Sequence, residues 1–228
     1  MNKTFSLREI FWNAFLKTKE NLLFFMGFAL IIIFVSLFFT MPLDFYAESI
    51  KEANPFGHSI ITLISFVLSM VVGAALAPGI VTISLKASRG EKPSLKDFLN
   101  KTQYITRIIL ASAIYFVLII IGFILLIIPG FFVLIRLQFT HYLIVDKNMG
   151  AIEAIKKSYE ITKGNTLKLF ALNLIVVPAL VVLGFLLLVI GMLAVIPMVY
   201  IMYAMVYDKL VGEVLLDDKP TKEQADIN

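Results

Sequence analysis

The chain has 228 residues, of which 60% are hydrophobic and only 16% are charged. With a mean hydropathy of +0.92, this composition excludes an ordinary soluble protein and is typical of an integral membrane protein. The net charge of +4 comes from short basic clusters beside apolar runs, so nucleic acid is not an expected partner, and the absence of cysteine excludes disulfides and thiol chemistry.

The first two apolar runs each predict one membrane span. Residues 21–41 are long enough to cross a bilayer and are followed by Pro42. This run is longer than the apolar core of a signal peptide, and no small-residue cleavage motif follows it, so we expect an uncleaved first span. A second span is expected over residues 59–84, where Gly73 and Pro78 suggest a bend.

The third apolar run, residues 105–145, is too long for one span. As a single helix it would measure about 60 Å, roughly twice the thickness of the hydrocarbon layer. Pro129 and Gly130 lie near its middle and predict a tight turn. We therefore expect two spans, over residues 106–128 and 131–146.

The last apolar run, residues 166–207, is equally long and again predicts two spans. Gly191 marks its most natural break. The expected spans are residues 166–190 and 193–208, which brings the total to six.

The distribution of basic residues predicts the orientation. With six spans, every lysine and arginine except Lys51 and Arg136 falls on one side of the membrane. By the positive-inside rule that side is the cytoplasm, so both termini are expected there. Residues 1–212 are expected to form a single transmembrane domain, and residues 213–228 a short, disordered cytoplasmic tail.

A short amphipathic segment precedes each pair of spans. The three segments begin "SLREIF" at Ser6, "SLKDFL" at Ser94 and "GAIEAI" at Gly150. Each has a residue suited to a helix N-cap and an acid three residues later, followed by apolar residues at helical spacing. We expect three helices lying at the membrane surface.

The chain therefore reads as a threefold repeat. The second and third pairs of spans align without a gap, which places Asp146 and Asp208 at equivalent inner ends. The expected fold class is all-α: a polytopic membrane protein with six transmembrane helices arranged as three hairpins, each preceded by a short amphipathic interfacial helix.

One stretch carries a resemblance to known proteins. It contains an Ile-Pro-Gly sequence at residues 128–130, Arg136, the inner acid Asp146, the sequence "EAIKKS" at residues 153–158 and Lys-Gly-Asn at residues 163–165. These features resemble an uncharacterised bacterial multi-spanning family that includes YciC-like inner-membrane proteins. The family also includes the membrane domain joined to some glycerophosphoryl diester phosphodiesterases.

The resemblance implies a six-helix fold in the bacterial cytoplasmic (inner) membrane, and it brings no established activity. Two positions depart from the family pattern: Lys147 stands where an acid is common, and Tyr159 where the aromatic residue is often tryptophan. No phosphodiesterase domain accompanies the chain, so that chemistry is not expected.

Residues able to support catalysis are scarce. The interiors of the predicted spans contain no aspartate or glutamate, which argues against a proton or sodium site built on an acid. His58 and His141 are expected on opposite sides and cannot share a metal ion. No hydrolase, metalloprotease or nucleotide-binding motif occurs, so we expect no enzyme, no cofactor and no metal.

Arg136 is the strongest single candidate for a functional residue. It is expected about 15 Å outward of Asp146, near the middle of the bilayer. An unpaired arginine there costs at least about 2.5 kcal/mol, so it should face the bundle or a wet cavity. It could bind an anionic headgroup or substrate. The favoured alternative is structural, with Arg136 binding carbonyls freed near Pro78 or Pro129, or binding Asn173.

Other polar residues surround Arg136 in the fourth predicted span. Gln138, His141 and Tyr142 share one helical face, and Thr140 lies beside Arg136. Two readings remain open, a buried polar network and a substrate path. The candidate ligand-binding residues are Arg136, Gln138, Thr140, His141 and Asn173.

Small residues recur every four positions in the second span, at Ser65, Ser69, Gly73 and Ala77. Such a ladder lets another helix approach closely, either from the same chain or from a second subunit. The residues assigned structural roles are Pro129, Gly130, Ser69, Gly73, Ala77 and Gly164.

Two functions follow from these observations. The first is a membrane protein that binds or moves a lipid or another amphiphilic anionic small molecule, with Arg136 at the anionic group. The alternative is a non-catalytic structural or assembly partner for other membrane proteins. Expected partners are membrane lipids and either another membrane protein or a second copy of the chain.

Overall fold

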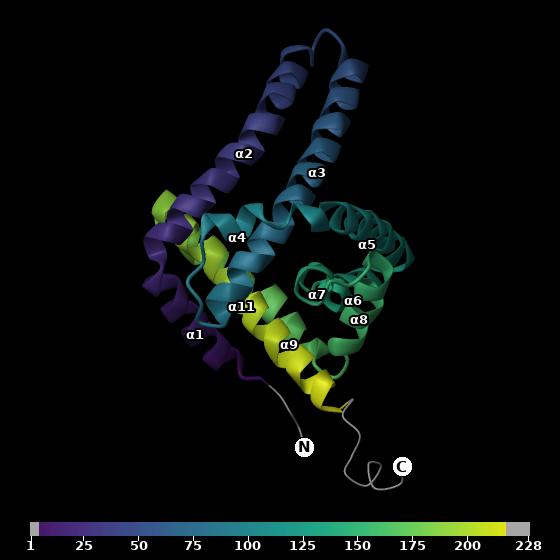
Figure 1. The fold of residues 1–228 in the computed structure, drawn as a ribbon. Coiled ribbons are helices and arrows are strands. Elements are labelled where there is room, and N and C mark those ends of the chain that lie inside the picture. The colour runs from purple at the N-terminus through teal and green to yellow at the C-terminus, as the bar shows by residue number, and fades with distance from the viewer. Residues whose placement is uncertain (1–4, 218–228) are drawn as a thin grey trace, which may run out of the picture.

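A computed structural model describes residues 5–217, and all regular elements in that range are helical, which confirms the expected all-α fold (Figure 1). The elements are α1 (Leu7–Glu20), α2 (Leu22–Ser49), α3 (Pro55–Ser88), α4 (Leu95–Leu99), the 3₁₀ turn η1 (Thr102–Tyr104), α5 (Ile105–Leu125), α6 (Ile127–Leu137), α7 (Thr140–Lys147), α8 (Ala151–Ile161), α9 (Thr166–Ala171), the π-helical turn η2 (Leu172–Val176), α10 (Val177–Leu186) and α11 (Leu188–Asp217). Of the tail expected at residues 213–228, residues 213–217 continue α11, and the rest lie outside the described residues.

Six helical segments are long and apolar enough to cross a membrane, as a multi-pass membrane protein requires. They are Leu22–Ser49, Pro55–Ser88, Leu95–Leu125, Ile127–Lys147, Thr166–Leu186 and Gly191–Gly212.

The three amphipathic segments are the helices α1, α4 and α8. The hydroxyls of Ser6 and Ser94 each accept a hydrogen bond from the backbone N–H three residues later. At α8 the carboxylate of Glu153 accepts instead from the backbone N–H of Gly150, at 3.3 Å. Each helix thus begins with a polar group on an otherwise unpaired backbone N–H.

Three boundaries differ from the sequence expectation, two of them at prolines. The break expected at Gly191 lies at Leu187 instead, and Gly191 falls inside α11, where a Cβ atom would lie 2.5 Å from the carbonyl oxygen of Gly184 in α10. Helix α2 passes through Pro42 and continues to Ser49. The turn between the third and fourth spans lies at Leu126, which is extended, and Pro129 is the third residue of α6. Proline is tolerated in the first turn of a helix because its missing N–H would have no helical partner there. Pro129 and Gly130 therefore lie just after the turn.

Glycine is required where α5 and α6 cross beside this turn. A Cβ atom on Gly122 would lie 3.0 Å from the Cα of Gly130, and one on Gly130 would lie 2.6 Å from the ring of Phe123. The two glycines let the backbones approach more closely than any larger residue would allow.

The fourth span is broken in its middle, a feature that the sequence did not predict. Helix α6 ends at Leu137, α7 begins at Thr140, and Gln138 and Phe139 lie between them. The hydroxyl of Ser158, from α8, donates to the carbonyl of Arg136 at 2.9 Å and accepts from the N–H of Phe139 at 3.2 Å. This buried serine replaces backbone hydrogen bonds that the break removes.

The three hairpins pack together at one end and separate at the other (Figure 1). In α3, residues 81–85 are buried, whereas apolar residues nearer the turn, such as Leu63 and Val71, are exposed. The residues beside all three hairpin turns are exposed: Phe45 and Phe56, Ile124 and Ile128, Phe185 and Leu186. We call the packed ends the base of the bundle and the separated ends the tips.

A cluster of ion pairs connects the helices at the base. The guanidinium of Arg89, directly after α3, contacts Asp146 at 2.8 Å and Asp208 at 2.7 Å. These are the two acids that the repeat alignment places at equivalent positions. Burial opposes the charge on Arg89, but its hydrogen bonds to both acids outweigh that effect and hold the pKa of the guanidinium above its usual value. One arginine thus connects the base ends of all three hairpins.

Candidate functional site

A cavity of about 660 Å³ lies where the hairpins begin to separate. Its walls come from α2, α3, α5, α6, α7, α9, η2 and α11, and most of its lining is apolar. In the described part of the chain no lysine, arginine, aspartate or glutamate lines it. The polar lining residues are Ser36, Tyr115, Gln138, Thr140, His141, Tyr142, Asn173, Tyr200 and Tyr203.

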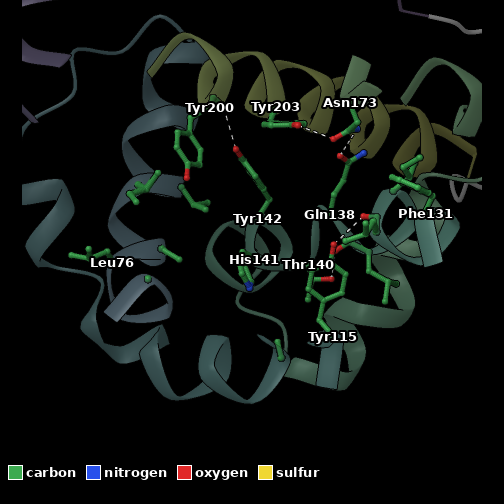
Figure 2. Close-up of a pocket in the computed structure, with 18 of the residues that line it drawn as sticks. Leu76, Tyr115, Phe131, Gln138, Thr140, His141, Tyr142, Asn173, Tyr200 and Tyr203 are labelled. Atoms are coloured by element: carbon green, nitrogen blue, oxygen red, sulfur yellow. Dashed lines mark hydrogen bonds between the residues drawn. The ribbon is translucent and has the colours of Figure 1, made fainter. Parts of the chain in front are cut away.

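A hydrogen-bonded chain of three side chains forms one wall of the cavity (Figure 2). The amide Nδ2 of Asn173 donates to Oε1 of Gln138 at 2.9 Å, and the hydroxyl of Tyr203 donates to Oδ1 of Asn173 at 2.8 Å. The Nε2 atom of Gln138 is buried and has no hydrogen-bond partner among the described residues. One donor in this wall is therefore unsatisfied.

The two amide side chains of this wall, those of Gln138 and Asn173, both lie where a helix is irregular. Gln138 lies in the break between α6 and α7, and Asn173 lies in the π-helical turn η2. The side chain of Asn173 also donates to the carbonyl of Leu169 at 2.8 Å. A π-helical turn leaves the usual helical hydrogen bonds unmade, and such turns are frequent at functional sites.

The hydroxyls of two further lining tyrosines reach backbone carbonyls. Tyr142 donates to the carbonyl of Tyr200 at 3.2 Å, and Tyr115 donates to the carbonyl of Leu134 at 3.1 Å (Figure 2). His141 lies 3.0 Å from the hydroxyl of Ser112, measured at Nε2. These contacts hold the cavity walls in place.

Thr140 lies on the cavity wall and also bonds a backbone carbonyl at the break between α6 and α7. Its hydroxyl donates to the carbonyl of Leu137 at 2.7 Å. Gln138, Thr140, His141 and Asn173 are thus gathered around one cavity, whereas Arg136 does not line it.

Arg136 occupies a different environment from either of its expected ones. Its side chain is buried, its Nη1 donates to the hydroxyl of Thr166 at 3.2 Å, and its guanidinium carbon lies 4.1 Å from the ring centre of Tyr159 and 5.1 Å from that of Phe132. No acid lies within ion-pair distance among the described residues, and Asn173 bonds Gln138 instead. The distance to Asp146 expected for a continuous helix does not apply, because the helix is broken between them.

The small-residue ladder of α3 faces open space over part of its length. A Cβ atom on Gly73 would meet nothing within 4 Å, and Gly73 and Ala77 line the cavity. Ser69 is exposed and donates to a carbonyl of its own helix. Only Ser65 contacts another helix through its hydroxyl, which donates to Asp44 of α2 at 2.5 Å. Elsewhere, Gly164 adopts a φ of +86°, which favours glycine.

Sequence reasoning missed Ser158 as the group that bridges the helix break. It also missed Tyr115, Tyr200 and Tyr203 as cavity residues. A usable signal existed for the last two, because they lie three residues apart on one face of an apolar span. Within residues 5–217, no group of three histidine, aspartate or glutamate side chains gathers as a metal site would require.

Comparison with known proteins places the chain in a family context. Residues 6–213 match a family described as "Protein of unknown function (DUF975)". No curated protein matches the chain, and no solved structure does.

Proposed function

The chain belongs to the DUF975 family of unknown function, and we propose that it is an integral membrane protein that binds or moves a lipid or another amphiphilic small molecule. The cavity is the proposed site. The observation that supports this proposal is a largely apolar cavity of about 660 Å³ with one polar wall, formed by Gln138, Asn173 and Tyr203. Ligand cavities of this size and composition are common in proteins.

The polar wall suggests how the headgroup is held. Gln138, Asn173 and Tyr203 form a hydrogen-bonded row on the cavity wall, and a rotation of the Gln138 side chain would bring its buried, unpaired Nε2 N–H to a ligand oxygen. Because no charged side chain lines the cavity, we propose a headgroup oxygen without a full negative charge, such as a carbonyl, hydroxyl or ester oxygen. This proposal replaces the anionic contact expected at Arg136, which lies outside the cavity lining.

The separated tips provide space for an apolar chain. The cavity begins where the hairpins diverge, and the exposed side chains beyond it, such as Leu63, Ile124 and Phe185, are apolar. A ligand with its headgroup at Gln138 could extend its hydrocarbon part between these surfaces without burying a polar group.

A cavity-filling substitution tests the proposal. Gly73 lines the cavity with open space around its missing Cβ, so Gly73→Leu should fill ligand space without a clash. Gly27→Leu is the matched control, because Gly27 also lies in a membrane-spanning helix with nothing within 4 Å of its missing Cβ, and it does not line the cavity. Native mass spectrometry of protein purified from membranes should show a co-purifying amphiphile with Gly27→Leu and its loss with Gly73→Leu. Equal retention by both variants would contradict the proposal.

A second candidate function, a structural or assembly partner, is favoured by the small-residue ladder. Ser69 and Gly73 lie exposed on α3, where a helix of another protein or of a second copy could approach closely. Because the chain contains no cysteine, Ser69→Cys gives a single site for crosslinking in membranes. Recovery of only uncrosslinked monomer would argue against this function.

Several wider expectations belong to the same proposal. We propose a non-enzymatic role in the bacterial cytoplasmic membrane, with both termini in the cytoplasm. The kinship with YciC-like proteins and with the phosphodiesterase-linked membrane domain also remains a proposal, supported by the Ile-Pro-Gly and "EAIKKS" sequences.

A further inference from the structure

Arg136 is a buried cation without an acidic partner. Only 5% of the residue is exposed, and no carboxylate lies within ion-pair distance in the described part of the chain. The one hydrogen bond of its guanidinium to a described residue goes to Thr166, and its Nε atom is buried without a partner. Buried arginines are normally paired with an acid, because an unpaired charge is costly to remove from water.

Aromatic rings cover the guanidinium. Tyr159 and Phe132 lie 4.1 and 5.1 Å from its central carbon. Tyr159 is 48% exposed, so the charge lies one side chain below the surface of α8. Contact with the two rings stabilises a cation in part, but it leaves the in-plane N–H groups unsatisfied.

The surface above Arg136 is basic. Ile152, Lys156 and Tyr159 lie on one exposed face of α8, and Lys163 lies two residues beyond the end of the helix. The two acids of α8 are already engaged beside this face. Glu153 accepts from the backbone at the start of the helix, and Glu160 forms a 3.0 Å ion pair with Lys157. Around Tyr159, the exposed face thus presents the cations Lys156 and Lys163, while the carboxylate of Glu153 lies at the start of the helix.

We infer that Arg136, Lys156 and Lys163 form a site for the phosphate of an anionic phospholipid headgroup, with Tyr159 as a movable cover over Arg136. Guanidinium groups bind phosphate through two parallel hydrogen bonds, and Arg136 has unpaired N–H capacity for such contacts. Rotation of the half-exposed Tyr159 ring would open the guanidinium to the surface. This site is separate from the cavity, which Arg136 does not line, and it goes beyond the proposed function.

Nanodiscs that contain the full chain test this site. Wild-type protein in phosphatidylcholine discs with added phosphatidylglycerol should unfold at a higher temperature than in phosphatidylcholine alone, and should retain phosphatidylglycerol in native mass spectrometry. Arg136→Met should abolish this difference and lower retention about tenfold, as expected for loss of a charge-assisted contact. The control Lys92→Met removes an exposed cation elsewhere and should keep both effects. If Arg136→Met keeps wild-type phosphatidylglycerol retention, whether or not it is less stable, the arginine is structural and the inference is wrong.

Exposed positions keep the test informative if Arg136→Met fails to fold. The double variant Lys156→Gln/Lys163→Gln changes only exposed side chains and should weaken phosphatidylglycerol retention, whereas Tyr159→Leu should not weaken it. Unchanged retention in the double variant, or its loss in Tyr159→Leu, would count against the site. Inorganic phosphate added to phosphatidylcholine discs should not raise the unfolding temperature; a rise equal to that given by the lipid would identify a free-anion site instead.

Discussion

Asn173 donates a 2.9 Å hydrogen bond from Nδ2 to Oε1 of Gln138, and this contact joins the π-helical turn η2 to the break between α6 and α7. Both irregular segments lie in membrane-spanning helices, where unsatisfied backbone groups are costly. Each irregular segment is tolerated because side chains form hydrogen bonds with backbone groups that the segment leaves unpaired. Thr140 and Asn173, which bond such backbone groups, also line the cavity, whereas Ser158 does not. The stability of these helices and the chemistry of the site therefore depend in part on the same residues.

The Gln138–Asn173 bond should have a measurable coupling energy. We predict that Gln138→Leu and Asn173→Leu each lower the free energy of unfolding, and that a double-mutant cycle gives a coupling of about 0.6–1.7 kcal/mol, the range found for hydrogen bonds between membrane helices. Thermal or denaturant unfolding in detergent measures it. Tyr203→Phe is the control: it removes only the tyrosine hydroxyl that donates to Asn173, and it should lower the free energy of unfolding by less. Purely additive effects of the two leucine variants would show that the bond contributes nothing.

Ser158→Ala should destabilise the protein more than a typical serine substitution. The change leaves the carbonyl of Arg136 with only the longer, 3.3 Å hydrogen bond from the hydroxyl of Thr162, and it leaves the N–H of Phe139 without a partner. Both groups are buried. The expected loss is about 1–3 kcal/mol, measured by unfolding in detergent. Ser69→Ala is the matched control, because Ser69 is exposed and bonds only its own helix. Similar losses for both variants would refute the role assigned to Ser158.

Gly122→Ala should disrupt the crossing of α5 and α6. The added methyl would meet the backbone of Gly130 at 3.0 Å, and backbone cannot move aside as a flexible side chain can. Gly27→Ala adds the same methyl to open space, and it should be neutral or raise stability by about 0.5–1 kcal/mol. The unfolding temperature of Gly122→Ala should therefore fall, and that of Gly27→Ala should stay the same or rise. If they coincide, the close approach at Gly122 is not needed.

Arg89→Lys should weaken the base of the bundle and make its stability sensitive to alkaline pH. A lysine cannot reproduce the contacts of one guanidinium with both Asp146 and Asp208. Because the pKa of Arg89 is raised in the folded protein, its stabilising effect is complete at any pH below its unfolded value, and it would be lost only as pH rises through the still higher folded value. A lysine loses its proton near pH 10.4, so the difference in unfolding temperature from wild type should widen above about pH 10. A constant difference would show that the charge at position 89 is unimportant.

Much of the fold could be predicted from sequence because its signals are local. Apolar run length predicts six spans, and serine or glycine followed by an acid predicts the starts of α1, α4 and α8. Gln138, Thr140, His141 and Asn173 could be singled out as candidates because polar side chains are rare in apolar spans.

The features that could not be predicted arise from contacts between distant residues. Nothing near Gln138 and Phe139 marks a helix break, because the group that stabilises it, Ser158, comes from another helix. The contacts of Arg136 with Thr166 and Tyr159 likewise come from residues distant in the sequence. The turn lies at Leu126 and not at Pro129, because a proline fits equally well in the first turn of the following helix as in the turn itself.

The central position of α11 has a consequence for how the protein is made. This helix packs along α1, α2 and α3, and Ile201, Met202 and Tyr207 within it are completely buried. It is also the last of the described helices to leave the ribosome. The contacts of α3 with α5 and α7 can form before α11 is made, whereas the contacts of α11 with the first hairpin can form only after its synthesis. Insertion and core formation are separate stages, and a chain interrupted before residue 188 would reach the membrane without the helix that completes its core.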